Sequence, residues 1–496
     1  MNQATSNTQK VVKGISSQTI VTIVLGIVEV LAFSIMSRLL SKEDFGYYAA
    51  ITAITAVFSS LSETGIGSAI VQKKDLTSRY INNAFTISLI IGSLLMVSLF
   101  LLSGVLARTV VDETLVVPLR LISVTLLCHC LTSVNRSIMQ RRLQFFRMGL
   151  IDLISLVVTT IIAVLLAIRG YGFYAILVKA IFASILSLIL TYVFAKTKYS
   201  LALDKQTFKS IFGFSGWLMV SSVFRNFAQQ ADRLLMSRLL SVASLGAYNR
   251  PKDFITSISS KFTTIFDSAL FPVLSGIQDK KDSMKNAYTT SLYYMNILSL
   301  LLAMAFCFNS ELIIRVFFGK EWISLNTVFR LLSLSVIFSV DGTLADCYLR
   351  SLALTKQQFV FRVFQLVLTI VGLVIGSKWG IVGVAMSVVI VNAIMIVAKL
   401  LYLSNWVEVS FAESMKIMVG SWKFSLLMGP VLILLLVFLP STLGCNIILL
   451  IAFLVLSVIC FFIFPDLVGK KYKDVAYSKV TAYAKSMLGR ISTVKR

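Results

Sequence analysis

The sequence has little charge for its length: 14% of its 496 residues are Asp, Glu, Lys or Arg, whereas 57% are hydrophobic. A soluble protein of this size needs far more charge to cover its surface, so the composition excludes a soluble globular chain. Apolar stretches of about 20 residues, long enough to cross a bilayer, recur from near the N-terminus to about residue 465. No gap between them could hold a soluble domain. The sequence therefore predicts an all-α integral membrane protein.

Histidine and cysteine are also scarce. The only histidine, His129, lies between Cys128 and Cys130, and no second Cys or His cluster completes a metal shell. Side-chain packing is favoured over a metal site there, and no metal is expected. The six cysteines are scattered through the apolar stretches and do not make a disulfide framework, although pairing of Cys307 with Cys445 stays open.

Catalytic motifs are missing as well. The sequence has no P-loop, no GxSxG and no DxD-like pair on an exposed domain, so ATP hydrolysis and glycosyl transfer within this chain both lack a site. We expect no enzyme activity, no catalytic residues and no cofactor. Energy for any transport would come from ions, the membrane potential or the substrate gradient, and coupling to H⁺ or Na⁺ stays open.

The hydrophobic windows predict about fourteen membrane spans. The second, fourth and eighth are polar for hydrocarbon, which a helix tolerates only where it faces protein or water. The predicted spans centre on Gly26, Ala53, Ser93, Thr125, Val158, Ile181, Leu218, Ile258, Leu298, Val336, Leu368, Val389, Ile433 and Leu454.

Basic residues concentrate on one side of this topology. If the N-terminus is cytoplasmic, most Lys and Arg fall in the two tails and in the inside loops near Lys73, Arg141, Lys198, Lys280, Lys356 and Lys416. The positive-inside rule then places both termini in the cytoplasm. Inside loops facing anionic lipid account for the net charge of +24 without nucleic acid. In the basic tail over 466–496, apolar residues at helical spacing predict an amphipathic helix on the inner leaflet.

A short repeat divides the chain in two. MSRLLS begins at Met36 and again at Met236, and a glycine follows each copy at Gly46 and Gly246. An even number of predicted spans separates the copies, so both lie on the outer face and the halves are parallel repeats. RRLQFFR at Arg141 is echoed by KQQFVFR at Lys356, and GYGFYAI and KWGIVGVA form a third matching pair.

The repeat predicts two parallel six-helix lobes. They are followed by two peripheral helices and the basic tail. The expected divisions are 1–200 for the N-lobe with spans 1–6, 201–405 for the C-lobe with spans 7–12, 406–465 for spans 13 and 14, and 466–496 for the cytoplasmic tail.

Four stretches of the sequence resemble a known family. They are SRLLSKEDFGYYAAITAITAVFSSLSETGIGSAIVQ from Ser37, DRLLMSRLLSVASLGAYN from Asp232, ALFPVLSGIQDKKD from Ala269 and VFFGKEW from Val316. In this combination the chain resembles the polysaccharide transporters of the multidrug/oligosaccharidyl-lipid/polysaccharide exporter superfamily, which include Wzx-type flippases of lipid-linked oligosaccharides. The resemblance covers the first twelve spans.

The resemblance implies a fold like that of the multidrug exporters, with twelve core helices in two lobes around a central cavity. It also implies location in the bacterial inner membrane and export of undecaprenyl-diphosphate-linked repeat units. Surface polysaccharides such as lipopolysaccharide or exopolysaccharide would be the product. Expected partners are the lipid-linked oligosaccharide, anionic membrane lipids, and the polymerase and glycosyltransferases of the same pathway; nucleic acid is not expected.

Spans 7 and 8 carry polar side chains that cannot face lipid, because each charge at the bilayer centre costs ~2.5–3.5 kcal/mol. Positive side chains there would attract a diphosphate, and amides and hydroxyls would bond sugar hydroxyls. The alternative is internal pairing with acidic residues, for example Arg250 with Asp253. The candidate substrate-binding residues are Arg225, Asn226, Gln229, Asn249, Arg250, Lys252 and Lys261, with Lys179 and Arg330 as further candidates.

Span 1 carries a lone acidic residue, Glu29, which corresponds to Gln229 by the repeat offset. An isolated carboxyl in a membrane can exchange a proton as access alternates, so Glu29 is a candidate coupling residue. A salt bridge to Arg225 or a packing hydrogen bond explains it equally well.

The sequence leaves several functions open. A flippase for lipid-linked oligosaccharides fits the cationic, hydroxyl-rich spans 7 and 8. A cation-coupled drug or metabolite antiporter of the same superfamily would be expected to have a more acidic and aromatic cavity. A flippase for the peptidoglycan lipid precursor is a close variant of the first function. A membrane polymerase typically needs a large outer loop, and the predicted outer loops are short.

Overall fold

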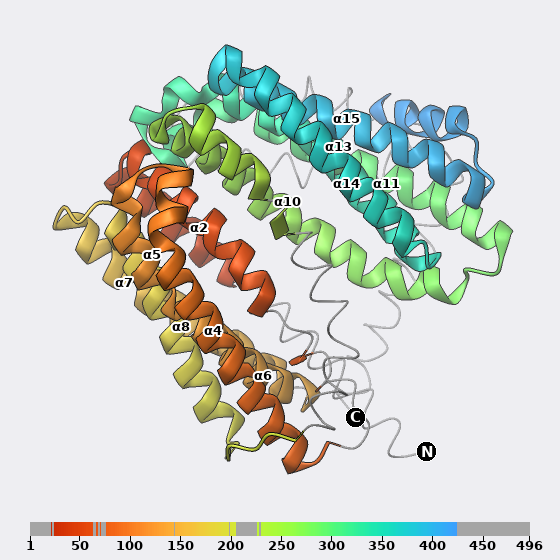
Figure 1. Ribbon diagram of the computed structural model, residues 1–496. Coiled ribbons are helices and arrows are strands. Elements are labelled where there is room, and N and C mark those ends of the chain that lie inside the picture. Colours follow the sequence, from red (N-terminus) through yellow and green to blue (C-terminus); the bar gives the residue numbers. More distant parts are fainter. Residues whose placement is uncertain are drawn as a thin grey trace, which may run out of the picture. The chain divides into compact units, whose positions relative to one another are not determined.

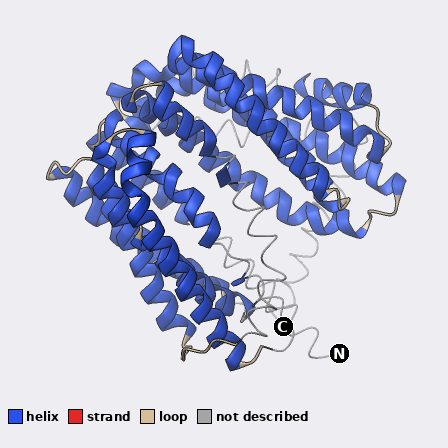
Figure 2. Cartoon of the chain, in the orientation of Figure 1, coloured by secondary structure: helices blue, strands red, loops and turns tan. Residues whose placement is uncertain are grey.

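The structure is a computed structural model that describes residues 21, 24–62, 66–67, 70, 76–142, 144–197, 199–204, 226–227 and 230–423. These described residues form helices, turns and loops, with no strand among them (Figures 1 and 2). The longer helices are α2 (Lys42–Ser62), α4 (Ser78–Val110), α5 (Val116–Ile122), α6 (Val124–Arg141), α7 (Phe145–Ile168), α8 (Phe173–Ala195), α10 (Val242–Gly276), α11 (Lys281–Phe308), α13 (Asn326–Ser351), α14 (Thr355–Gly376) and α15 (Gly380–Val407). The short ones are η1 (Glu113–Leu115), α12 (Ser310–Ile313), η2 (Ile314–Phe318), η3 (Lys320–Leu325) and η4 (Ser377–Trp379).

Seven helical segments of the described chain are long and apolar enough to cross a membrane. They run over Ser78–Val110, Glu113–Arg141, Phe145–Ile168, Phe173–Ala195, Lys281–Phe308, Lys320–Ser351 and Thr355–Val407, the last of which contains both α14 and α15. The predicted all-α membrane class is confirmed. The number fourteen stays a prediction, because the spans centred on Leu218, Ile433 and Leu454 lie outside the described residues, as does the tail.

The described helices group into two compact units. Unit 1 comprises Met1–Arg250, Phe317–Trp322 and Leu366–Val384; unit 2 comprises Pro251–Val316, Ile323–Gln365 and Ala385–Arg496. In unit 1, α6 packs against both α4 and α8, and α7 packs against α8. In unit 2, α11 packs along α13. The predicted lobe boundary at residue 200 stays a prediction.

The repeated MSRLLS forms the same corner in both copies. A helix over 24–39 ends before Ser41, and a helix over 230–239 ends before Ser241; α2 and α10 begin at the next residues. The Asp44 N–H donates to Ser41 Oγ at 3.1 Å, and the Ser41 N–H donates to Asp44 Oδ2 at 2.9 Å. At the second corner the Ser244 N–H donates to Ser241 Oγ at 3.2 Å. The last serine of the repeat is therefore a helix N-cap.

The two following glycines bring these helix starts together within unit 1. A Cβ built on Gly46 would lie 2.0 Å from the Val242 carbonyl oxygen, and one built on Gly246 would lie 1.9 Å from that of Lys42. The contact is reciprocal, since equivalent positions of the two copies exchange roles, as in an isologous interface. Any side chain at either glycine would collide with backbone.

A third pair of equivalent positions supports the repeat. Gly172 precedes α8 with φ of 53°, and Gly380 begins α15 with φ of 67°. Both lie in the GYGFYAI and KWGIVGVA echo, and both adopt a backbone conformation that glycine reaches without penalty. The sequence echo thus reflects one shared turn geometry.

Candidate functional site

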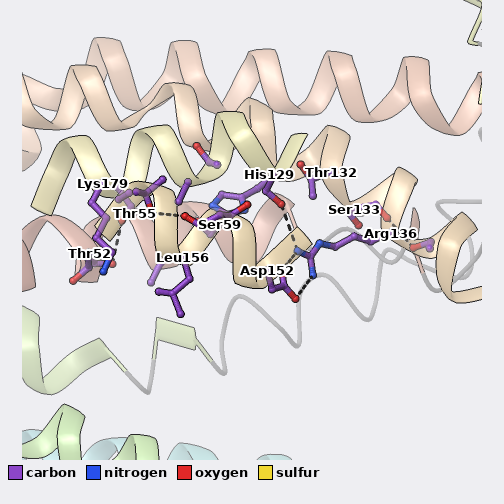
Figure 3. Close-up of a pocket in the computed structure, with 18 residues that line it drawn as sticks. Thr52, Thr55, Ser59, His129, Thr132, Ser133, Arg136, Asp152, Leu156 and Lys179 are labelled. Carbon is purple, nitrogen blue, oxygen red and sulfur yellow. Dashed lines mark hydrogen bonds and ion pairs between the residues drawn. The ribbon is translucent and has the colours of Figure 1, made fainter. Parts of the chain in front are cut away.

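Unit 1 contains a cavity of about 830 Å³ between α2, α6, α7 and α8 (Figure 3). Each helix contributes residues spaced mostly three or four apart, which places them on one helix face. They are Thr52, Thr55, Ala56 and Ser59 on α2; His129, Thr132, Ser133, Arg136 and Ser137 on α6; Asp152, Ser155, Leu156 and Thr159 on α7; and Lys179, Ala180, Ala183, Ser184 and Ser187 on α8.

Most polar residues that line the cavity are serines and threonines. Several of their hydroxyls donate to their own helix backbone, as Thr55 does to the Ile51 carbonyl and Thr159 to the Ser155 carbonyl. The hydroxyl of Ser155 is buried and has no hydrogen-bond partner in the described part of the chain. The cavity wall can therefore accept further hydrogen bonds from a polyhydroxyl ligand or water.

An ion pair crosses the cavity between α6 and α7. The guanidinium of Arg136 pairs with the carboxylate of Asp152, with Nη1 lying 3.4 Å from Oδ2. A second nitrogen of Arg136 donates to Ser187 Oγ on α8 at 3.4 Å. Arg136 thus joins three helices, and Asp152 neutralises its charge.

Lys179 is the other cationic residue of the cavity. Figure 3 places it near Thr52, at the end away from Arg136 and Asp152. Its side chain is half-buried, and within the described ranges its ammonium group makes neither an ion pair nor a hydrogen bond. Arg250 and Glu29 are the charged groups whose fields reach it. An ionisable side chain within a membrane-spanning helix is a candidate functional residue.

His129 also faces this cavity, between Lys179 and the Arg136–Asp152 pair (Figure 3). Its neighbours Cys128 and Cys130 are buried in the helix packing, as expected from the sequence. In the part of the chain that the structure describes, no group of three His, Cys, Asp or Glu residues could hold a metal ion. His129 is thus part of the polar wall.

The residues singled out from spans 7 and 8 have varied positions. Arg225 and Gln229 lie outside the described residues, and Asn226 is half-buried. Asn249 is 2% exposed and accepts a hydrogen bond from Arg233 Nε at 3.1 Å. Lys252 and Lys261 are half-buried on α10, and both have interaction partners. Glu29 is exposed on the helix over 24–39 and also has a partner.

Arg250 is engaged by the first repeat corner. Its Nη2 donates to the Phe33 carbonyl at 2.7 Å and to Ser37 Oγ at 2.8 Å. Its guanidinium carbon lies 3.3 Å from the Phe33 ring centroid and 4.0 Å from that of Phe45. These contacts give Arg250 a hydroxyl, a backbone carbonyl and two aromatic rings as internal partners, whereas its pairing with Asp253 stays a prediction.

Sequence reasoning largely missed the polar faces of α2, α6, α7 and α8 that line the cavity. It singled out the polar character of the second and fourth spans, which become α2 and α6, and named Lys179 only as a further candidate. A polar residue at every third or fourth position of each helix was the available signal.

The fold and the cavity define a multi-pass membrane transport protein built on an internal repeat. A family profile described as "Polysaccharide biosynthesis protein" matches residues 35–327, more than half of the chain. The chain belongs to this polysaccharide biosynthesis protein family.

Two curated relatives are similar over most of their length. The lipopolysaccharide biosynthesis protein WzxC of Escherichia coli (strain K12) is 22% identical over 390 residues, which cover 78% of this chain and 79% of that protein. The teichuronic acid biosynthesis protein TuaB of Bacillus subtilis (strain 168) is 21% identical over 348 residues, which cover 68% of this chain and 70% of that protein.

Solved structures show the same fold. The lipid II flippase MurJ in an inward closed conformation matches with a TM-score of 0.74 and 16% identity, over 90% of this chain and 98% of that one. An inward-facing multidrug resistance MATE family transporter of the MOP superfamily matches with a TM-score of 0.64 and 13% identity, over 80% of this chain and 98% of that one. The predicted MATE-like architecture is confirmed.

Proposed function

We propose that this protein moves undecaprenyl-diphosphate-linked oligosaccharide repeat units across the bacterial inner membrane for surface-polysaccharide biosynthesis. Its family and the names of its relatives support this class of cargo. The observation that carries the proposal is the composition of the cavity. Its lining combines the ammonium group of Lys179, which bonds no carboxylate of the described residues, with many serine and threonine hydroxyls.

The cargo has two parts with opposite solvation. The polyprenyl tail stays in lipid, so only the diphosphate and the sugars need a polar route. Lys179 would attract the diphosphate through charge-assisted hydrogen bonds, and the serine and threonine hydroxyls would bond sugar hydroxyls. The volume of about 830 Å³ suits a polar headgroup rather than a long polymer. Transport of one repeat unit at a time by alternating access fits this size.

Two other cargoes are less well supported. A drug or metabolite antiporter for organic cations would be expected to present acidic and aromatic side chains. Among the described residues that line the cavity there is no Phe, Tyr or Trp, and the one carboxylate is paired with Arg136. A peptidoglycan precursor is chemically close to the proposed cargo, and likeness to MurJ at 16% identity concerns the fold alone.

We also propose that both termini lie in the cytoplasm. The predicted topology places successive loops on alternate sides of the membrane, and contacts in unit 1 join loops that it places on the same side. At one end, Asn82 bonds Ser200 and Arg141 bonds the Ile70 carbonyl. At the other end, Asp44 bonds the Phe173 N–H, Arg238 bonds the Arg108 carbonyl and Trp322 bonds the Ser37 carbonyl.

Anionic lipids, a polymerase and glycosyltransferases of the same pathway are the proposed partners.

The test is flipping of a labelled lipid-linked oligosaccharide in liposomes containing the purified full chain. Lys179→Ala should lower the rate about tenfold or more, because a hydrogen bond to a charged group contributes ~1.5–3 kcal/mol. Lys179→Arg should retain much of the activity, since it keeps the positive charge. Lys196→Ala is the matched control, an exposed lysine just beyond the end of the same helix. Normal flipping by Lys179→Ala would remove Lys179 from the binding site.

A further inference from the structure

Unit 2 buries an acidic side chain between α11 and α13. Asp341 is 1% exposed, and Asn296 opposite it is fully buried. The Asn296 side-chain nitrogen lies 2.5 Å from Asp341 Oδ2, and Ser421 Oγ lies 2.5 Å from the Asn296 side-chain oxygen. Ser421 belongs to the helix over 411–423. The three residues form one polar chain across three helices.

One oxygen of this carboxyl group has no partner among the described residues. Asp341 Oδ1 is buried and makes no hydrogen bond to any residue that the structure describes. Among the described residues, the only donor to the group is therefore the Asn296 amide at the other oxygen. Such an orphaned oxygen in a protein interior needs a physical reason.

The charged and titratable neighbours do not supply a counter-charge. From α11, Tyr288 lies within electrostatic reach of Asp341, and its phenol is an uncharged group whose hydroxyl contacts Ser414. From α15, Lys399 Nζ lies 3.3 Å from the Gly342 carbonyl, but it pairs with Asp346 at 2.7 Å. From the helix over 411–423, Ser421 and Ser414 approach α11 with hydroxyls, which carry no charge.

An ionised carboxylate in this position is strongly unfavourable, because burial removes its hydration and one amide donor does not replace it. A proton on Asp341 removes the charge. The Asn296 amide fits either protonation state, because its oxygen and nitrogen can exchange places. With the proton bound, the Asp341 O–H donates to the Asn296 oxygen and the Asn296 nitrogen donates to Ser421 Oγ.

We propose that Asp341, Asn296 and Ser421 form a proton-binding site, in which Asp341 is a neutral carboxylic acid in the closed packing of α11 and α13. When water reaches Oδ1, the O–H bond breaks, the proton leaves to that water and the carboxylate remains. The site would link movement of the helix over 411–423 and of α11 against α13 to proton uptake and release. This inference does not rest on the identity of the cargo.

Infrared spectroscopy of the purified full chain in lipid tests the site without any transport assay. The carbonyl stretch of a protonated carboxylic acid is separate from the amide bands and from ionised carboxylates. We expect a carboxylic acid band near neutral pH that Asp341→Asn removes. Asp346→Asn is the matched control on the same helix, and it should leave the band, because Asp346 pairs with the ammonium group of Lys399. Identical spectra of the wild type and Asp341→Asn in this region would overturn the proposal.

Two further variants keep the test decisive. Asn296→Ala removes the hydrogen-bond partner of the acid and should move the band to higher frequency, whereas an unmoved band would overturn the assigned geometry. Asp341→Glu retains the carboxyl group and should retain a shifted band, which serves if Asp341→Asn does not fold. Absence of a carboxylic acid band in both the wild type and Asp341→Glu would likewise overturn the proposal.

Discussion

Gly46 and Gly246 each lie against the backbone at the start of the other's helix, Gly46 on the Val242 carbonyl and Gly246 on that of Lys42. The two glycines hold equivalent positions in the two copies of the repeat. The reciprocal contact accounts for the glycine that follows MSRLLS in each copy.

Alanine at either glycine should destabilise the protein. A Cβ there would lie within 2.0 Å of a carbonyl oxygen, so backbone must move, and overpacking of this kind costs ~1–3 kcal/mol. We expect Gly246→Ala to lower the thermal unfolding midpoint of the full chain in detergent. Gly104→Ala is the control, since nothing lies within 4 Å of a Cβ at that helical position. Equal midpoints for Gly246→Ala and the control would contradict the close contact.

A stability measurement distinguishes a structural role of Arg250 from a ligand-binding role. Arg250→Lys keeps the charge but loses the flat stacking on Phe33 and the forked hydrogen bonds to Ser37 and the Phe33 carbonyl. We expect a loss of ~1–3 kcal/mol in stability, measured by thermal or denaturant unfolding.

The control for Arg250 is Arg315→Lys, an exposed residue paired with Glu311 one turn away, where the change should stay within ~0.5 kcal/mol. If Arg250→Lys instead keeps full stability and loses only flipping, Arg250 binds cargo and its internal contacts are incidental.

The ion pair between Glu408 and Lys281 should make a pH-dependent contribution to the stability of the protein. The hydrogen bond and charge of Lys281, at 2.5 Å, hold the pKa of the Glu408 carboxyl below its usual value. A lowered pKa in the folded state means that the contribution is present above the unfolded-state pKa of Glu and is lost as pH falls through the folded-state value.

Comparison of Glu408→Gln with the wild type over the acidic range measures this effect. The two should differ in unfolding midpoint near neutral pH and converge at low pH, and the difference should shrink in high salt because both side chains are exposed. A difference that grows on acidification would show that the sign is wrong.

The orientation of the loops is testable in intact cells. In a background without the native cysteines, single cysteines at Lys280 and Lys356 should be shielded from an impermeant thiol reagent added outside, whereas one at Lys320 should react. Reaction at all three positions after permeabilisation is the control for accessibility. Labelling of the cysteine at Lys280 from outside would contradict the predicted topology.

Sequence periodicity was enough to predict helices, membrane insertion and the repeat, because each depends on patterns along one chain. The position of Met36 against Met236 showed that two halves are related, but not that Gly46 and Gly246 touch. Such a contact depends on the angle at which two helices cross, and the hydropathy pattern of a sequence does not determine that angle.

The cavity was harder to predict for the same reason. A stripe such as Thr52, Thr55 and Ser59 is equally compatible with helix packing, and it becomes a cavity wall only when three other polar stripes face it. The pairing of Asp152 with Arg136 likewise depends on the packing of α6 against α7.

The Arg136–Asp152 pair has a consequence for how the cargo preference could change. Since these two charges cancel, Lys179 sets the net sign of the side chains that line the cavity in the described part of the chain. A single substitution to an acidic residue would invert that sign while leaving the hydroxyl wall and the helix packing in place.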